Sequence, residues 1–284
     1  MKELAQISEA CGLHFAGCKA VSGGDINRAY EISTTTEKFF LKLNNAREFP
    51  DMFAAETKGL HTLLTNTNLK VPRVIKNGVT GETQYLLIEW LDKGVPVKSF
   101  WEDFGAGLAA MHKESTNYFG FDGDNYIGCL PQKNEACASW PEFYAAQRIL
   151  PLVKQLYNNG SFSPKDVTDT EALCAVFSDL FPEEPPALLH GDLWSGNFLT
   201  TSNGCAAIFD PSVYYGHREM DIGMSLLFGG FDRKFYDAYN SAYPLQTGWE
   251  GRVRLAQLYS LLVHAVLFGG HYISSAANII RQYK

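Results

Sequence analysis

His190-Gly191-Asp192-Leu193-Trp194-Ser195-Gly196-Asn197, followed by Ile208-Phe209-Asp210-Pro211, is the part of this sequence that decides its fold. It places an Asp, an Asn and a second Asp at offsets of 0, +5 and +18. Transfer of a phosphoryl group from ATP requires a carboxylate that orients the attacking hydroxyl, and oxygen ligands for the Mg²⁺ that neutralises the phosphates. The spacing therefore predicts a kinase-like phosphotransferase in which Asp192 orients the hydroxyl while Asn197 and Asp210 hold metal. A helix-capping Asp and a turn Asn are the structural alternative.

The composition limits the classes of protein to consider. The chain has 284 residues, of which 46% are hydrophobic and 19% charged, enough for one large core or two modest ones. Its 24 basic and 31 acidic residues give a net charge of −7, without the basic patch of a nucleic-acid binder. The N-terminus lacks the apolar core of a secretory signal, and the apolar stretch 258–268 is too short to span a bilayer. We therefore expect a cytoplasmic enzyme, favoured to be a monomer, that binds neither nucleic acid nor membrane.

The six cysteines form no C-x-x-C pair and have no His partner at zinc-finger spacing. A disulfide framework is not expected in a chain of this length without a sign of secretion. The sequence therefore predicts reduced thiols and no structural metal.

The first ninety residues have the patterns of a β-rich lobe. Strands are predicted over Ile26–Ser33, around the alternating Phe39, Leu41 and Leu43, and over Gln84–Trp90. The alternation turns Lys42 to the face opposite the two leucines. Pro50–Leu64 is predicted to be a helix on which Glu56 interrupts an apolar stripe, and a carboxylate drawn inward needs a cationic or hydrogen-bonding partner. Lys42 is the expected partner.

From about residue 100 the periodicity becomes helical. The predicted helices are Phe100–His112, Pro141–Tyr157, Pro164–Leu180, Glu219–Phe228 and Trp249–Arg281. The last is apolar on most of its surface and should lie centrally, with a break at Gly269-Gly270. The chain is therefore expected to be an α+β protein of two lobes, with a nucleotide-binding lobe over residues 1–91 and a helical catalytic and substrate lobe over residues 92–284.

Several elements occur in the order of a protein-kinase-like core. Ser22, Gly23 and Gly24 form a glycine turn that could cover phosphates, Lys42 and Glu56 form an ion pair aimed at ATP, and Glu89-Trp90-Leu91 could contact the adenine through its backbone. In isolation, a glycine pair is more often a simple turn, and the Lys and Glu more often surface residues.

Two departures from the protein-kinase pattern favour a small-molecule kinase. Gly191 stands where a regulated protein kinase has Arg, and Asp210-Pro211-Ser212 replaces D-F-G. Only ten residues separate Asp210 from Asp221, which leaves no room for a long regulatory loop. We expect an enzyme that is active once both substrates are bound.

With these motifs in place, the chain resembles the fructosamine kinase (ketosamine-3-kinase) family essentially from end to end. The segments that carry the resemblance are Gly23–Tyr30, Phe119–Phe121, Asn125–Gly128, Pro131-Gln132, His190–Asn197 and Asp210–Glu219. The resemblance implies a two-lobed kinase-like fold, related to aminoglycoside and choline kinases, and phosphorylation of a sugar hydroxyl on ketoamines, which promotes deglycation of proteins. Some members have a cysteine in the glycine loop where this chain has Asp25.

Carried over by position, the resemblance implies that Asp192 is the catalytic base and that Asn197 and Asp210 bind Mg²⁺. It also implies that Lys42 with Glu56 positions ATP, and that Asp221 holds the catalytic loop. The expected partner is a small ketoamine, such as ribulosamine or fructosamine phosphorylated at its 3-hydroxyl, or a glycated lysine.

Substrate contacts and alternative activities follow less directly from the sequence. Sugar rings stack on aromatic faces, and their polar groups meet acidic or imidazole side chains; the candidates are Trp194, Tyr214, His217 and Glu219. The same residues could equally pack the lobe. The rival functions are a methylthioribose, choline, homoserine or aminoglycoside kinase of the same fold, or a nucleotide-binding pseudokinase.

Overall fold

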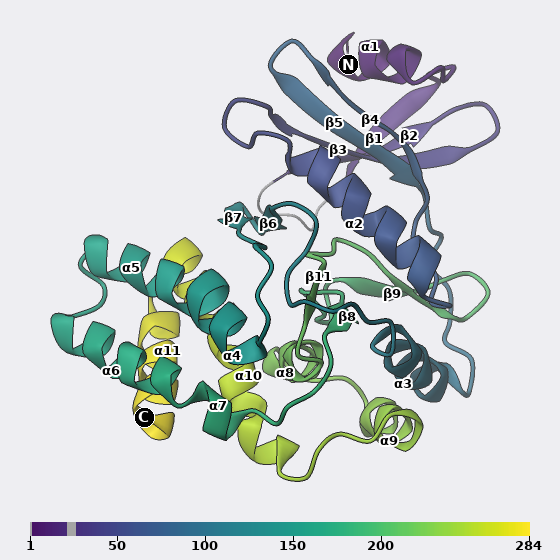
Figure 1. Cartoon of the computed structure of the whole chain (residues 1–284). Helices are drawn as coiled ribbons and strands as arrows, with labels where there is room; N and C mark the ends of the chain where they lie inside the picture. Colours follow the sequence, from purple (N-terminus) through teal and green to yellow (C-terminus); the bar gives the residue numbers. More distant parts are fainter. Residues whose placement is uncertain (1, 22–26) are drawn as a thin grey trace. The chain divides into compact units, whose positions relative to one another are not determined.

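The computed structural model describes residues 2–21 and 27–284, which form two compact units (Figure 1). The first unit comprises residues up to 100 together with 198–211, and the second comprises 101–197 and 212–284. The predicted glycine turn, Ser22, Gly23 and Gly24, lies outside the described residues. The first unit extends past the expected boundary at residue 91 because the backbone continues to bond within it. The Gly94 N–H donates to the Thr200 carbonyl at 2.9 Å.

The first unit contains a five-stranded antiparallel sheet, in the order β1-β2-β3-β5-β4, together with the helices α1 and α2 and the two-stranded ribbon β9-β10. Its elements are α1 (Lys2–Ala10), β1 (Gly17–Val21), β2 (Arg28–Ser33), β3 (Lys38–Asn45), α2 (Met52–Asn66), β4 (Val74–Thr80), β5 (Thr83–Glu89), β9 (Phe198–Thr200) and β10 (Ala206–Ile208). Each strand predicted from alternation is present, and β5 is shifted by one residue from its predicted bounds. Ile26, the predicted start of the strand that ends at Ser33, lies outside the described residues.

The two faces of this sheet are covered by different helices. Leu41 and Leu43 of β3 belong to one buried cluster with Leu4 and Ile7 of α1. Because successive strand residues point to opposite faces, Lys42 faces away from that cluster and toward α2, which lies along the sheet in Figure 1. The predicted orientation of Lys42 is therefore confirmed.

The second unit is mainly helical. Its elements are α3 (Phe100–Met111), β6 (Asn125–Ile127), β7 (Leu130–Gln132), α4 (Trp140–Phe143), the π-helix η1 (Tyr144–Ile149), α5 (Leu150–Asn158), α6 (Pro164–Ala175), α7 (Phe177–Leu180), β8 (Ala187–Leu189), β11 (Tyr214–Gly216), α8 (Glu219–Leu227), α9 (Arg233–Ala242), α10 (Trp249–Phe268) and α11 (His271–Tyr283). The sequence patterns did not reveal α9 or the three-residue strands.

Helix α10 is the centre of the second unit, as its apolar surface predicts. Leu255, Leu258 and Leu262 are fully buried in the main cluster. The predicted break at Gly269-Gly270 is confirmed, since both residues adopt left-handed φ values of +64° and +59° and separate α10 from α11. Among the described residues, no helix is both long and apolar enough to cross a membrane.

The predicted helix Pro141–Tyr157 is continuous but contains one wide turn. The Leu150 N–H donates to the Ala145 carbonyl, five residues back, and Pro151 follows directly. Proline has no N–H and clashes with the preceding turn, so a local change of the bonding pattern accommodates it. The predicted helix Pro164–Leu180 is instead interrupted at Val176, between α6 and α7.

Candidate active site

Lys42 is a buried cation of the first unit. Its ammonium lies 2.7 Å from Glu56 Oε1 and 2.5 Å from Asp210 Oδ1, and its side chain is 7% exposed. Burial acts to lower the pKa of Lys42, but the Asp210 and Glu56 carboxylates outweigh burial and raise that pKa well above its ordinary value. The ammonium is therefore charged and fixed between two carboxylates. The predicted contact of Lys42 with Glu56 is present.

Asp210 follows the ribbon strand β10, which is fastened to the rest of the first unit. The Ile208 N–H donates to the Lys70 carbonyl at 2.9 Å. Asp210 has a left-handed φ of +55°, a conformation that Asp tolerates better than most residues. Its side chain is 42% exposed while Oδ1 contacts Lys42, so Asp210 is open to a ligand.

The loop after β8 carries Asp192 and Asn197 in the second unit. Asn197 Nδ2 donates to the Asp192 carbonyl at 2.8 Å and to Asp192 Oδ2 at 2.9 Å. The amide nitrogen thus closes the loop and orients the Asp192 carboxylate. The remaining Asn197 oxygen is the atom type that hard divalent cations bind.

Asp221, at the start of α8, holds the backbone of this loop. Its carboxylate accepts hydrogen bonds from the backbone N–H groups of His190 at 2.7 Å and Gly191 at 2.9 Å, and contacts His112 Nε2 at 3.2 Å. Burial alone would raise the pKa of Asp221, but the His112 contact and the N–H donors outweigh burial and lower it. Asp221 therefore remains ionised at neutral pH and holds the loop backbone, the role that the family resemblance implies.

Gly191 has no space for a side chain. Its φ is +82°, and a Cβ atom built on it would lie 2.1 Å from the Ser212 carbonyl oxygen. The close approach arises because the Ser212 N–H donates to the His190 carbonyl at 2.8 Å and brings the two backbones together. The sequence identified Gly191 only as a missing Arg, whereas the structure gives the physical reason for glycine.

The predicted adenine-contacting segment lies at the end of β5, in the first unit. The Glu89 carboxylate is bound to Lys70 Nζ at 2.8 Å and accepts from the Arg73 N–H at 3.1 Å, so its side chain is committed to protein contacts. Burial would raise the pKa of Glu89, but Lys70 and Arg73 outweigh burial and lower it. Trp90 packs on Phe40, with ring centroids 6.3 Å apart, and Phe40 shares a β3 face with Lys42. Leu91, the other predicted contact, is half-buried.

Trp194 begins an aromatic row in the second unit. Its ring meets Phe228 edge to face at 5.7 Å, and Phe228 contacts His264 at 5.0 Å. Burial lowers the pKa of His264, whose Nδ1 lies 2.7 Å from the Ser260 carbonyl. Neither Phe228 nor His264 was predicted from the sequence to lie beside the catalytic loop residues; the one available signal was that His264 interrupts the apolar stretch of α10.

The other three candidate substrate residues are covered within the second unit. Tyr214 is 1% exposed and packs on the Arg148 guanidinium at 4.1 Å. His217 is fully buried 3.7 Å from Glu184, and burial lowers its pKa to about 4. Glu219 is 3% exposed and forms a two-point ion pair with Arg252. These contacts favour the packing role that the sequence left open for them.

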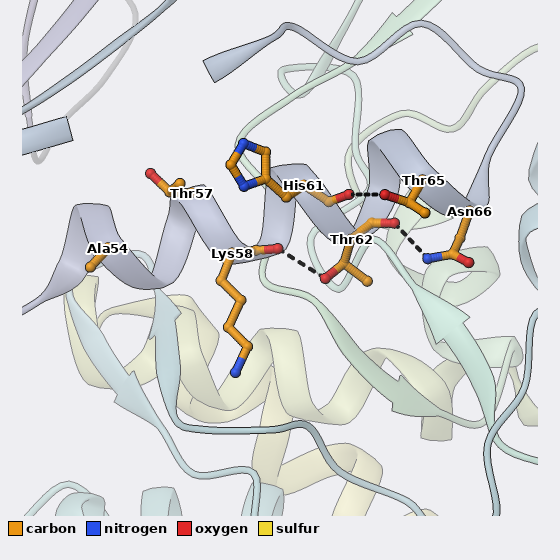
Figure 2. A pocket seen from close by; sticks show the side chains of 7 residues that line it. All are labelled: Ala54, Thr57, Lys58, His61, Thr62, Thr65 and Asn66. Carbon is orange, nitrogen blue, oxygen red and sulfur yellow. Dashed lines mark hydrogen bonds between the residues drawn. The ribbon is translucent and has the colours of Figure 1, made fainter. Parts of the chain in front are cut away.

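A hollow on the outer face of α2 is a separate feature of the first unit (Figure 2). It is lined by Ala54, Thr57, Lys58, His61, Thr62, Thr65 and Asn66. Figure 2 shows that the Thr62 and Thr65 hydroxyls and the Asn66 amide bond to carbonyls four residues earlier in the same helix. Because these polar groups are satisfied by the helix, we assign the hollow no part in the chemistry.

Solved structures identify the fold. Aminoglycoside phosphotransferase APH(4)-Ia, in a variant solved with ADP and hygromycin B, has a TM-score of 0.63 at 15% identity, with 97% of each chain covered. At that identity the likeness concerns the fold alone, and it confirms the predicted kinase-like α+β fold.

Closer relatives identify the family. A family model described as fructosamine kinase matches residues 2–284, and the chain belongs to this family. A protein of Thermobifida fusca described as a fructosamine-3-kinase has a TM-score of 0.88 at 36% identity, covering 98% of this chain and 96% of its own. A protein of Synechocystis named a probable ketoamine kinase is 38% identical over 98% of this chain and 94% of its own. The chloroplastic protein-ribulosamine 3-kinase of Arabidopsis thaliana is 39% identical over 93% of this chain and 81% of its own.

The family defines the enzyme class. The chain is an ATP-dependent phosphotransferase with an alcohol group as acceptor, as the sequence predicts.

Proposed function

We propose that this enzyme phosphorylates the 3-hydroxyl of the sugar in a ketosamine, either ribulosamine or fructosamine. The names of its relatives support the ketoamine class. The observation that carries the chemistry is the bonding of Asn197 to Asp192, which orients a carboxylate on a loop anchored by Asp221. We place the enzyme in the cytoplasm and favour a monomer that acts on a free ketoamine or a glycated lysine.

Asp192 is the general base in this proposal. Its carboxylate, oriented by the Asn197 amide, accepts the proton of the sugar hydroxyl while the hydroxyl oxygen attacks the γ-phosphorus and ADP leaves. Phosphorylation at the 3-position destabilises the ketosamine and releases the amine. Lys42, charged and fixed by Glu56, orients the α- and β-phosphates.

The oxygen donors of Asp210 and Asn197 suit Mg²⁺. Asp210 in the first unit keeps a half-exposed carboxylate, and Asn197 in the second keeps an oxygen whose amide nitrogen is already used. Each is a hard oxygen donor of the type that Mg²⁺ binds, and we propose both as its ligands. When bound, Mg²⁺ would neutralise charge on the β- and γ-phosphates.

The aromatic row supplies the proposed acceptor surface. Trp194 lies two residues from Asp192, and its ring is fixed by Phe228 and by Gly196, where a Cβ would fall 2.4 Å from the indole. A rigid aromatic face on the same loop as the base suits the apolar face of a sugar ring. We propose that Trp194 contacts the sugar.

The test is transfer of ³²P from ATP to fructosyl-lysine and ribulosyl-lysine, beside choline, methylthioribose, homoserine and an aminoglycoside. We expect transfer to a ketosamine, and a loss of about 10³-fold in kcat for Asp192→Ala. Asp237→Ala is the matched control, because Asp237 is an exposed carboxylate on α9 of the same unit. Transfer only to another alcohol would overturn the substrate assignment.

A further inference from the structure

A buried amide in the second unit joins three separate elements. Gln132, the last residue of β7, is 2% exposed. Its Nε2 donates to Asn125 Oδ1 at 2.7 Å and to the Ser212 carbonyl at 3.2 Å, and its Oε1 accepts from the Tyr259 hydroxyl at 2.7 Å. Both ends of the amide are thus used, and only an amide supplies this combination of donors and acceptor.

Gln132 bonds to the backbone of Ser212, the first residue after the 198–211 segment of the first unit. Ser212 donates through its N–H to the His190 carbonyl at 2.8 Å and through its hydroxyl to the Tyr126 carbonyl at 2.8 Å. Asn125 Nδ2 donates to the Val213 carbonyl at 2.8 Å. The β6–β7 hairpin therefore fixes residues 212–213, and Ser212 in turn fixes His190, two residues before Asp192.

Arg148 of η1 holds the other side of the same cluster. Its fully buried guanidinium donates to Asn134 Oδ1 at 2.6 Å, and Asn134 Nδ2 donates to Asn125 Oδ1 at 2.9 Å. The guanidinium also lies 5.4 Å from the ring of Tyr259. Burying a cation against carbonyl oxygens and aromatic faces is costly, and Arg148 Nε has no hydrogen-bond partner among the described residues, so the cluster is a poor choice for stability alone. Its hydrogen bonds instead hold Asn134 and Asn125 in one geometry.

The direction of the Tyr259 bond is fixed. Burial raises the pKa of Tyr259 well above its ordinary value, so its hydroxyl keeps the proton that it donates to Gln132. This donor leaves the Gln132 nitrogen, not its oxygen, facing the Ser212 carbonyl.

We propose that Gln132 is a positioning residue for phosphoryl transfer, acting through Ser212 and His190 to place the Asp192 carboxylate. This inference rests on the proposed role of Asp192. The hydrogen bonds of the amide end on Asn125, Ser212 and Tyr259 of the second unit, so we expect its effect on the rate of the chemical step.

The primary test is Gln132→Leu, which removes the amide at similar size. We expect kcat to fall at least tenfold, since misplacement of a reacting group by about 1 Å can cost 10²-fold. The KM for ATP should stay within about twofold, because the Lys42 ion pair belongs to the first unit. Thr170→Val is the matched control: Thr170 is fully buried in the same unit and donates one hydrogen bond to the Asp166 carbonyl at 2.7 Å. It should lower Tm without lowering kcat.

A second variant separates positioning from folding. Tyr259→Phe removes one hydroxyl and should lower kcat by a smaller factor, and the double variant should be no slower than Gln132→Leu alone, because both act through one amide. The inference is overturned if Gln132→Leu, or Tyr259→Phe should the former not fold, changes kcat no more than Thr170→Val does at a temperature where each is folded. Strictly additive losses in the double variant overturn it as well.

The choice of acceptor keeps this test separate from that of the proposed function. The variants are compared with the wild type on whichever alcohol the wild type phosphorylates. If the wild type phosphorylates none, the proposed function fails, and the rate of ATP hydrolysis then serves as the measure for Gln132.

Discussion

Gly191→Ala probes the backbone contact on which the catalytic loop depends. A left-handed φ costs a non-glycine residue about 1–2 kcal/mol. The new Cβ would also lie 2.1 Å from the Ser212 oxygen and 2.7 Å from its carbonyl carbon, so one backbone must move. Forced overpacking of this kind costs about 1–3 kcal/mol. We therefore expect the free energy of unfolding to fall by about 2–5 kcal/mol.

Gly160→Ala isolates the steric part of that loss. Gly160 lies in the same unit with a φ of +79°, and a Cβ there would meet no atom within 4 Å. It should therefore cost only the backbone share, about 1–2 kcal/mol. Chemical denaturation of both variants measures the difference. A difference below about 1 kcal/mol would refute the claim that the Ser212 carbonyl excludes a side chain at residue 191.

The same substitution should affect catalysis more than nucleotide binding. Any shift of Gly191 disturbs its N–H bond to Asp221 at 2.9 Å and moves the adjacent Asp192. We expect kcat to fall by about 10²-fold, with little change in the KM for ATP. Equal loss in Gly160→Ala would show that general destabilisation, and not the loop, is responsible.

Two further predictions concern buried charge. Lys42→Met leaves the Glu56 side chain, 11% exposed, without its cation, and we expect the free energy of unfolding to fall by about 3–5 kcal/mol. We also expect that ATP with Mg²⁺ no longer raises the Tm of this variant. Lys58→Met on the outer face of α2 is the control, and retained stabilisation by ATP in Lys42→Met would contradict its role. His217 has a pKa of about 4 in the folded protein, whereas in the unfolded chain its pKa is the ordinary 6.5. Between these two pH values only the unfolded chain takes up the proton. The stability that His217 contributes above pH 6.5 is therefore lost as the pH falls to 4. Chemical denaturation at pH 6.5 and at pH 4 measures this loss of unfolding free energy, which should be about 3 kcal/mol larger for the wild type than for His217→Gln. Equal losses in the two proteins would contradict the prediction.

The ion pair of Lys42 could be predicted because each half rests on local periodicity. Alternation in β3 turned Lys42 away from the leucines, and the helical spacing placed Glu56 between Met52 and Leu60, both of which are buried. A carboxylate on an apolar stripe needs a cationic or hydrogen-bonding partner, and Lys42 on the preceding strand is the obvious candidate.

The buried ion pairs of the second unit could not be predicted in this way. Glu219 meets Arg252 from α10, and His217 lies near Glu184 on a segment before β8. Such partners are far apart in sequence and follow no period, so closeness to Asp210 in the chain made both residues look like substrate contacts. That residues 198–211 belong to the first unit could not be predicted either, because the three-residue strands β9 and β10 are too short to show alternation.

The packing at Gly191 also bears on how this enzyme is controlled. In regulated protein kinases an Arg at this point of the loop reads a phosphate on the activation segment. Here the Ser212 carbonyl occupies that space, and the ten residues between Asp210 and Asp221 are taken up by β11 and the start of α8. There is no room at residue 191 for an Arg that binds a phosphate, and none between Asp210 and Asp221 for a long loop that carries one. The loop is instead held by Asp221 and Ser212, two contacts that need no modification to form, so we expect turnover to follow the concentrations of ATP and acceptor alone.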